Sequence, residues 1–161
     1  MENIPIDLSF LEKYSLLFAV WMNLCIFVAI NSTVVMAQHN DIGKWGEQMA
    51  IDYLRHRGYT IRDCDWRYRH RDIDIVALTE DMRTIVFVEV KTRTSAAVAT
   101  PDQAIDLAKV KSIGYAANAY IKQNCIMLDV RFDIVTIVGT MDEGIPQIQH
   151  LEDAFNPMLA Y

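Results

Sequence analysis

Two short charged motifs in the middle of the chain have the residue types of a metal site. The first contains Asp72 and Asp74, and the second contains Glu89 and Lys91. Residues two apart on a β-strand face the same side, so the two charged residues of each motif project together. If the strands are neighbours, Asp74 lies against Glu89, and two carboxylates are ligands that suit Mg²⁺ or Mn²⁺. The spacing therefore predicts a metal site on Asp74 and Glu89.

The chemistry that fits these residues is hydrolysis of a phosphodiester. A divalent ion polarises the phosphate and activates water. Lys91 would orient or deprotonate the attacking water, or offset negative charge in the transition state. The alternative is a plain ion pair between Glu89 and Lys91 at a solvated strand end. We favour the metal site because both motifs lie on otherwise apolar strands, where a charge is costly unless it is paired or metal-bound.

Hydrophobic periodicity and turn residues predict the elements that position the motifs. A first helix begins at Asn40 or Asp41 and ends at Gly58. A second begins with Thr100 as its N-cap and runs to Gln123. The expected strands cover residues 59–66, 72–78, 84–91 and 131–138, with a short final strand at 147–151. This order, α-β-β-β-α-β, predicts an α/β domain with a mixed central sheet flanked by helices.

The two strands that carry the motifs are expected to form an antiparallel hairpin, because only a short turn separates them. In the first strand, Ile73, Ile75 and Ala77 are expected to share one face of the sheet. The second strand is almost continuously apolar up to Glu89, which is typical of a central strand covered on both faces.

The length of 161 residues suits one domain, but apolar residues are concentrated near the start. We divide the chain into a hydrophobic extension, residues 1–37, and a globular domain, residues 38–161. Three explanations of the extension stay open. It is a membrane anchor, a cleaved signal peptide, or a segment upstream of the true start of the protein. The last is considered because the globular domain could naturally begin at Met36. The apolar run 16–30 is shorter than the roughly 20 residues that span a bilayer. We expect a cytoplasmic protein, with attachment to the inner membrane through residues 16–37 as the alternative.

The net charge of −6 argues against a protein that coats nucleic acid without specificity. It is compatible with a nuclease, because metal-binding carboxylates are acidic. The three cysteines, Cys25, Cys64 and Cys125, have no metal-ligand spacing, and we expect them to be buried thiols.

A run of cations and aromatic residues precedes the first acidic motif. We expect Arg67, Arg69 and Arg71 to contact the DNA backbone, while the neighbouring aromatic rings stack on unpaired bases. Lys109 and Lys111 are candidates for further phosphate contacts. The alternative is a solvated loop.

Taken together, the motifs resemble those of the YraN family, a little-characterised group of bacterial proteins. That family is assigned to the restriction-endonuclease-like fold and is similar to archaeal Holliday-junction resolvases. The resemblance covers about residues 40–155 and rests on six segments: 43–50, 58–59, 66–67, 72–77, 86–93 and 131–135.

The resemblance implies a restriction-endonuclease-like core with Asp74, Glu89 and Lys91 as the catalytic triad. It also implies that Glu47 is a helix-borne acid beside the metal, and we add Arg93 to the residues expected to bind nucleic acid. The implied activity is Mg²⁺- or Mn²⁺-dependent cleavage of DNA, with branched or junction DNA among the substrates. Resolving a junction needs two cuts, so a homodimer is expected.

The chain departs from the family pattern at one place. The family usually has Gly-Glu where this chain has Arg71 and Asp72. Asp74 is retained, so metal binding is still expected. The departure leaves a second interpretation open, a non-catalytic nucleic-acid-binding protein on the same fold. A third interpretation, a membrane-tethered interaction module, depends on residues 16–37.

Overall fold

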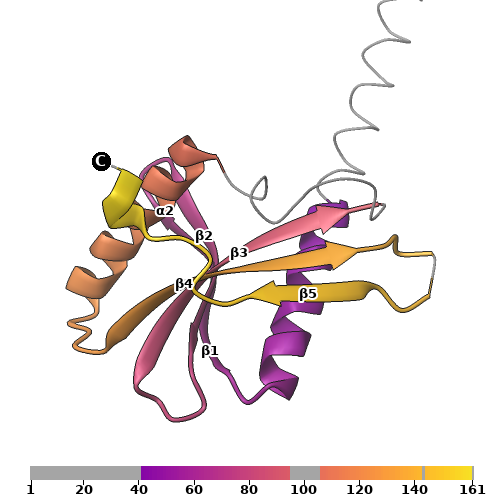
Figure 1. The fold of residues 1–161 in the computed structure, drawn as a ribbon, viewed down its shortest axis with the longest axis horizontal. Coiled ribbons are helices and arrows are strands. Elements are labelled where there is room, and N and C mark those ends of the chain that lie inside the picture. Colours follow the sequence, from indigo (N-terminus) through magenta and orange to yellow (C-terminus); the bar gives the residue numbers. More distant parts are fainter. Residues whose placement is uncertain (1–40, 95–105, 143, 161) are drawn as a thin grey trace, which may run out of the picture. The chain divides into compact units, whose positions relative to one another are not determined.

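The computed structural model describes residues 41–94, 106–142 and 144–160. Residues 41–56 form a helix, and the elements that follow are β1 (Thr60–Tyr68), β2 (Arg71–Leu78), β3 (Thr84–Arg93), α2 (Leu107–Gln123), β4 (Asp129–Val138), β5 (Gln147–Leu151) and the 3₁₀ helix η2 (Pro157–Ala160). Figure 1 shows the sheet between the helix of residues 41–56 and α2. The predicted α/β class is confirmed, and the arrangement is consistent with a restriction-endonuclease-like core.

The sheet is mixed, and its five strands lie in the order β1-β2-β3-β4-β5. The pairs β1–β2, β2–β3 and β4–β5 are antiparallel, which confirms the predicted hairpin. β3 and β4 are parallel, and α2 makes the crossover between them. β3 is therefore the central strand, which explains why its sequence is apolar on both faces.

The sheet has a hydrophobic core on each face. On one side, Leu54 of the helix 41–56 packs with Val86 and Val88 of β3. On the other side, Tyr120 of α2 packs with Phe87 of β3. Alternate residues of β3 therefore belong to opposite cores. Later side chains of the strand continue this alternation, so each faces either the helix 41–56 or α2.

The helix 41–56 ends as its sequence predicts. Gly58 has a positive φ of 85°, which a residue without a Cβ adopts at little cost. The amide of Tyr59 donates to the carbonyl of Leu54 at 3.0 Å, and the amide of Gly58 donates to that of Arg55 at 3.0 Å. These two bonds form a Schellman motif, so the last carbonyls of the helix are satisfied as the chain turns into β1.

The same helix approaches β3 closely at Gly46. A Cβ at this buried position would lie 1.9 Å from Thr92 Oγ1 and 3.0 Å from Thr92 Cβ. Only glycine permits this spacing, so Gly46 brings the first turns of the helix against the end of β3. Glu47, the next residue, is held near that end of the sheet.

The second helix begins later than predicted. Its N-cap is Asp106, with φ −84° and ψ 159°, and the Asp106 carboxylate accepts a hydrogen bond from the amide of Lys109 at 2.7 Å. An extended residue cannot lie inside a helix, so the expectation of one continuous helix from Thr100 to Gln123 is wrong. The predicted end at Gln123 is confirmed. Thr100 lies outside the described residues.

The predicted alternation of β2 is also wrong at one residue. Ile75 and Ala77 join the core beneath the helix 41–56, but Ile73 joins the core beneath α2. The ladder between β2 and β3 ends at the pair Ile75–Val88. Beyond that pair the backbone ladder of β2 continues only with β1, so the faces of β2 no longer follow those of β3.

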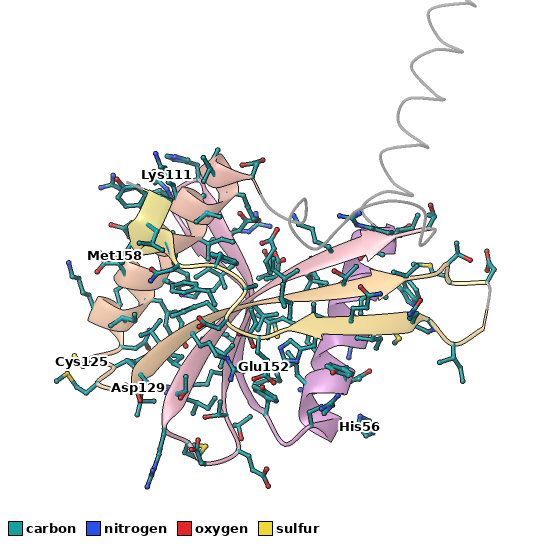
Figure 2. All side chains as sticks on the ribbon, viewed as in Figure 1. His56, Lys111, Cys125, Asp129, Glu152 and Met158 are labelled. Atoms are coloured by element: carbon teal, nitrogen blue, oxygen red, sulfur yellow. The ribbon has the colours of Figure 1, made fainter. Side chains whose placement is uncertain are left out.

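Two of the three cysteines contradict the expectation of buried thiols. Cys64 and Cys125 are exposed. Cys64 lies on the edge strand β1, and Cys125 lies in the turn that follows α2 (Figure 2). Cys25 lies outside the described residues. The two hydrophobic cores therefore form without either described thiol.

Contacts divide the chain into two units, Met1–Asp41 and Ile42–Tyr161, and the second carries the sheet. Within residues 41–94, 106–142 and 144–160, the helices are too short or too polar to cross a membrane. The segment 16–37, considered above as an anchor, lies outside the described residues.

Candidate functional site

The candidate site lies where β2 and β3 part. Their ladder ends at Ile75–Val88, and Asp74 and Glu89 are the next residue on each strand. Asp74 Oδ2 accepts a hydrogen bond of 2.7 Å from the amide of Val90. The carboxylate of Asp74 therefore spans the gap between the strands and reaches the backbone beside Glu89. This brings the two predicted metal ligands together.

Glu89 and Lys91 face the same side of β3, as their spacing predicts. Lys91 Nζ lies 2.6 Å from Glu89 Oε1, and the Glu89 side chain is only 3% exposed. The other oxygen, Glu89 Oε2, is also buried, and the ammonium of Lys109 lies 3.1 Å from it as an ion pair without ideal hydrogen-bond geometry. A buried carboxylate requires a counter-charge, so both of its oxygens are suited to a cation.

Asp74 is held in surroundings that disfavour its charge. Burial, and then the nearby charge of Glu89, raise the pKa of Asp74 to about 7, against an ordinary value of 3.8. The hydrogen bond from Val90 and the ammonium of Lys109 act in the opposite direction but do not cancel the effect. A divalent cation between the two carboxylates would relieve this repulsion.

The donor set fits Mg²⁺ or Mn²⁺ held by two protein ligands. Asp74 and Glu89 offer hard oxygens, and Glu89 Oε2 already lies 3.1 Å from a cation, the ammonium of Lys109. Across the described ranges, no three His, Cys, Asp or Glu side chains gather closely enough to form a full cage. Mg²⁺ is usually bound by one or two carboxylates and completes its shell with water and substrate phosphate, so two ligands are sufficient.

Glu47 lies within electrostatic reach of this cluster, on the helix 41–56. Burial raises the pKa of Glu47, and the charges of Asp65 and Asp72 raise it further. The charge of Glu47 in turn helps to raise the pKa of Asp74. The predicted helix-borne acid is therefore near Asp74, at the margin of the pair formed by Asp74 and Glu89.

Lys109 of α2 also belongs to this cluster. Its Nζ lies 3.1 Å from Glu89 Oε2 and 3.5 Å from Asp72 Oδ1. Burial by itself would lower the pKa of this ammonium, but Glu89 and Asp74 raise it above its ordinary value. Sequence reasoning treated Lys109 as a phosphate contact and missed these pairings, because no local pattern links residue 109 to residue 89.

The predicted arginine run does not form one continuous surface. Arg67 makes two 3.1 Å hydrogen bonds to the carboxylate of Asp65, and its side chain is 70% exposed. Trp66 and Tyr68 project from the other face of β1, with ring centroids 6.2 Å apart and planes within 3° of parallel. Arg67 is therefore separated from the aromatic pair by the strand itself.

The other two arginines lie against aromatic rings. Arg69, with a positive φ of 58° in the turn between β1 and β2, lies over the ring of Tyr68 at 5.5 Å. Arg71 lies over the ring of Tyr115 of α2 at 4.8 Å. Arg93 is the last residue of β3, on the strand that carries Glu89 and Lys91. The four arginines of the predicted nucleic-acid site thus lie on β1, the turn that follows it, β2 and β3.

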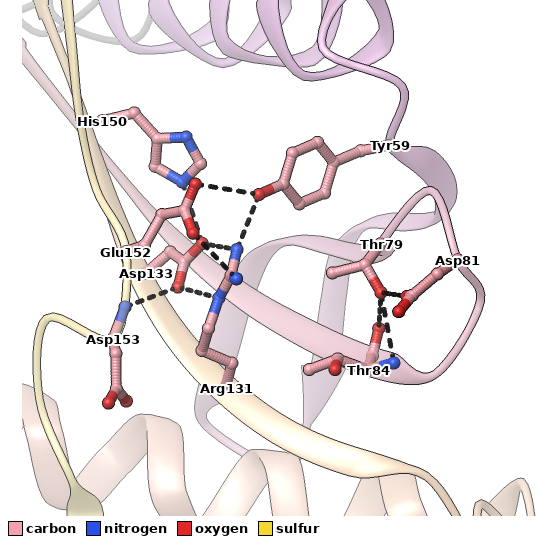
Figure 3. Close-up of polar contacts among 9 residues, drawn as sticks. All are labelled: Tyr59, Thr79, Asp81, Thr84, Arg131, Asp133, His150, Glu152 and Asp153. Carbon is pink, nitrogen blue, oxygen red and sulfur yellow. Dashed lines mark hydrogen bonds and ion pairs between the residues drawn. The ribbon is translucent and has the colours of Figure 1, made fainter.

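A second polar network lies deep in the sheet, around Asp133 (Figure 3). Asp133 is completely buried and accepts hydrogen bonds from Arg131 at 2.8 and 2.9 Å and from the amide of Asp153 at 3.0 Å. His150 Nε2 lies 2.8 Å from it. Burial alone would raise the pKa of Asp133, but these hydrogen bonds hold it below its ordinary value. Asp133 therefore has several structural partners within the fold.

This network ties distant segments together. Arg131 donates to the hydroxyl of Tyr59 at 2.6 Å and lies 2.9 Å from Glu152. Tyr59 follows the helix 41–56, and Glu152 follows β5, so one guanidinium joins both to β4. Because its members already satisfy one another, the network serves to hold the fold.

The fold and the site together define an α/β protein with a restriction-endonuclease-like core and an acidic cluster where two strands part. This chain belongs to UPF0102, described as an uncharacterised protein family, whose model matches residues 46–137. The YraN resemblance seen in the sequence is thereby confirmed. The matched range contains Glu47, Asp74, Glu89 and Lys91.

Three relatives illustrate the similarity. A UPF0102 protein of Bacteroides thetaiotaomicron is 46% identical over 124 residues, which cover 77% of this chain and 99% of the relative. One of Porphyromonas gingivalis is 42% identical over 77% of this chain and 90% of the relative. One of Flavobacterium psychrophilum is 38% identical over 74% of this chain and 98% of the relative. None of these three names states an activity.

Proposed function

We propose that this protein is a divalent-metal-dependent nuclease that hydrolyses phosphodiester bonds in DNA. One observation carries the proposal: Asp74 and the buried Glu89 converge where β2 and β3 part, so two carboxylates share one poorly solvated site. Two acids in such a place repel each other, and a divalent cation held by both would relieve that repulsion.

Each residue of the cluster has a distinct role in this proposal. Asp74 and Glu89 hold Mg²⁺ or Mn²⁺, which supplies Lewis-acid activation of the phosphate when bound. Lys91, 2.6 Å from Glu89, places a positive charge beside the reacting phosphate, where it orients the attacking water or offsets developing negative charge. Glu47 adds negative charge at the margin, which strengthens the attraction for a cation.

The surroundings of the cluster support a nucleic-acid substrate. Arg67, Arg69 and Arg71 place cations on β1, the adjacent turn and the start of β2, and the half-buried ring of Tyr68 lies on the same edge strand, stacked on Trp66, which packs against the core beneath α2. Cations position the phosphate backbone, whereas aromatic faces bind unpaired bases. Unpaired bases occur at branch points, so branched DNA is the first substrate to test. A homodimer would supply the two cuts that a junction requires.

The test combines metal binding with cleavage. Calorimetric titration with Mn²⁺ is run on the wild type, Asp74→Asn and Glu89→Gln, with Asp129→Asn as the matched control because this acid is exposed at the start of β4. Cleavage of linear, flapped and four-way DNA is then measured with Mg²⁺ or Mn²⁺. We expect the first two variants to lose most metal affinity and all cleavage, and the control to keep both.

The alternative is a non-catalytic nucleic-acid-binding protein, favoured by the presence of Arg71 and Asp72 in place of the family's Gly-Glu. Wild-type protein that binds neither Mg²⁺ nor Mn²⁺, with or without DNA, would refute the nuclease. DNA binding that persists in that case would support the binding protein.

A further inference from the structure

Glu89 lies between two ammonium groups that come from different elements. Lys91 belongs to the same strand and lies 2.6 Å from Oε1. Lys109 reaches over from α2 and lies 3.1 Å from Oε2. Both contacts are short ion pairs, and the contact to Lys91 also has the geometry of a directed hydrogen bond. Lys109 thus supplies the positive charge beside Oε2.

Lys109 is placed to neutralise several acids. Its Nζ also lies 3.5 Å from Asp72, and its charge acts on Asp74. A lysine ammonium is a compact point charge on a flexible stem, so it serves several carboxylates where an arginine fork would be fixed to one. The Lys109 ammonium therefore lies where a positive charge is needed to offset the charges of Asp74 and Glu89.

We propose that Lys109 is the built-in counter-ion of the metal-free site and leaves Glu89 Oε2 when the divalent cation binds. The released ammonium then contacts a phosphate of the bound DNA. This inference rests on the proposed function, because it requires that Asp74 and Glu89 take up a metal.

Electrostatics favour this exchange. A divalent cation on Oε2 would lie within a few ångströms of the present Nζ position, where the repulsion between the two cations is large in a poorly solvated site. The ion has twice the charge of the ammonium and reaches both Asp74 and Glu89 at once, so the lysine is the group displaced. The backbone of Lys109 stays in place, because its amide is bound to the N-cap Asp106 at 2.7 Å. Only the side chain, which is 26% exposed, has to move.

Metal affinity without DNA is the first test. Lys109→Met removes the charge but keeps the length of the stem, and Lys122→Met makes the same change at the exposed far end of α2. Calorimetry with Mn²⁺ should show roughly tenfold tighter binding by the Lys109 variant, since the metal no longer competes with an ammonium. The Lys122 variant should match the wild type. Equal or weaker binding by Lys109→Met would overturn the inference, because it would make Lys109 a supporting residue.

Stability and labelling provide tests that do not depend on that affinity. In EDTA, Lys109→Met should have a lower melting temperature than the wild type, and saturating Mn²⁺ should close the gap. In the wild type, an amine-acetylating reagent followed by mass spectrometry should label Lys109 faster once Mg²⁺ is added, with Lys122 unchanged. A labelling rate at Lys109 that Mg²⁺ does not alter would refute displacement even if the variant failed to fold.

The two proposals fail in different ways. If the wild type does not bind Mn²⁺, or if Asp74→Asn binds it as well as the wild type, the metal site itself is wrong. If the wild type binds Mn²⁺ through Asp74 and Lys109→Met binds no tighter, only the role of Lys109 is wrong.

Discussion

Replacing Asp74 by asparagine should stabilise the protein, by an amount that grows with pH. The folded protein holds the pKa of Asp74 at about 7, against 3.8 ordinarily, because burial and Glu89 disfavour the charge. The folded state therefore binds the proton more tightly than the unfolded chain does, and stability is lost as pH rises from about 4 to about 7. At about 1.4 kcal/mol for each pH unit, the loss approaches about 4 kcal/mol above pH 7. Asparagine does not titrate, and its amide oxygen can still accept the Val90 hydrogen bond.

The measurement is urea unfolding of wild type and Asp74→Asn in EDTA, at intervals from pH 4.5 to pH 8.5. The free energy of unfolding of the variant should exceed that of the wild type by little at pH 4.5 and by about 1–4 kcal/mol at pH 8.5. The upper figure of about 4 kcal/mol applies if the folded protein does not relax around the charged carboxylate. Asp129→Asn removes the same charge at an exposed position, so it is the control for the altered net charge. Adding Mn²⁺ should remove the difference by stabilising the wild type alone. A difference that stays constant with pH, or reverses sign above pH 7, would refute the reasoning.

Three further predictions concern neighbouring features. Lys91→Ala should slow cleavage by on the order of a hundredfold without weakening Mn²⁺ binding, since Lys91 acts in the chemical step. A variant that is less stable but cleaves normally would make it a plain ion-pair partner. The double change Arg67→Ala and Arg69→Ala should lower the salt dependence of DNA binding by about one unit of slope for each lost phosphate contact; an unchanged slope in fluorescence anisotropy would mean that these arginines are merely solvated. Gly46→Ala should destabilise the fold by about 1–3 kcal/mol in urea titrations, because its Cβ would meet Thr92 Oγ1 at 1.9 Å; wild-type stability would show that the helix is not held so closely to β3.

Local patterns were sufficient to predict the elements of the site. Alternation along residues 84–91 predicted that Glu89 and Lys91 share a face, and the structure joins them at 2.6 Å. The short turn before Thr84 predicted the antiparallel hairpin. Gly58 predicted the helix end, because a left-handed residue after a helix favours glycine wherever the helix lies. These features depend on neighbours in the chain, so the sequence alone defines them.

The sequence also identified Asp74 and Glu89 as a pair of acids, and their spacing on adjoining strands brings them together. It did not predict that the ladder stops beside them, or that Ile73 turns to the other core. Where a ladder stops depends on the twist of the whole sheet, and the twist depends on every strand and on both covering helices. Only the tertiary structure sets that point.

The partner of Glu89 Oε2 was likewise beyond sequence reasoning. Lys109 meets Glu89 because α2 crosses from β3 to β4 over one face of the sheet, and the N-cap at Asp106 sets where its first turn begins. Asp133 shows both cases: Arg131 is two residues away on the same strand, whereas its other partner, His150, comes from β5 and has no local signal. A buried charge attracts whichever opposite charge the fold carries within a few ångströms. The chain thus determined which acids need a counter-charge, and the packing of its helices determined which residue supplies it.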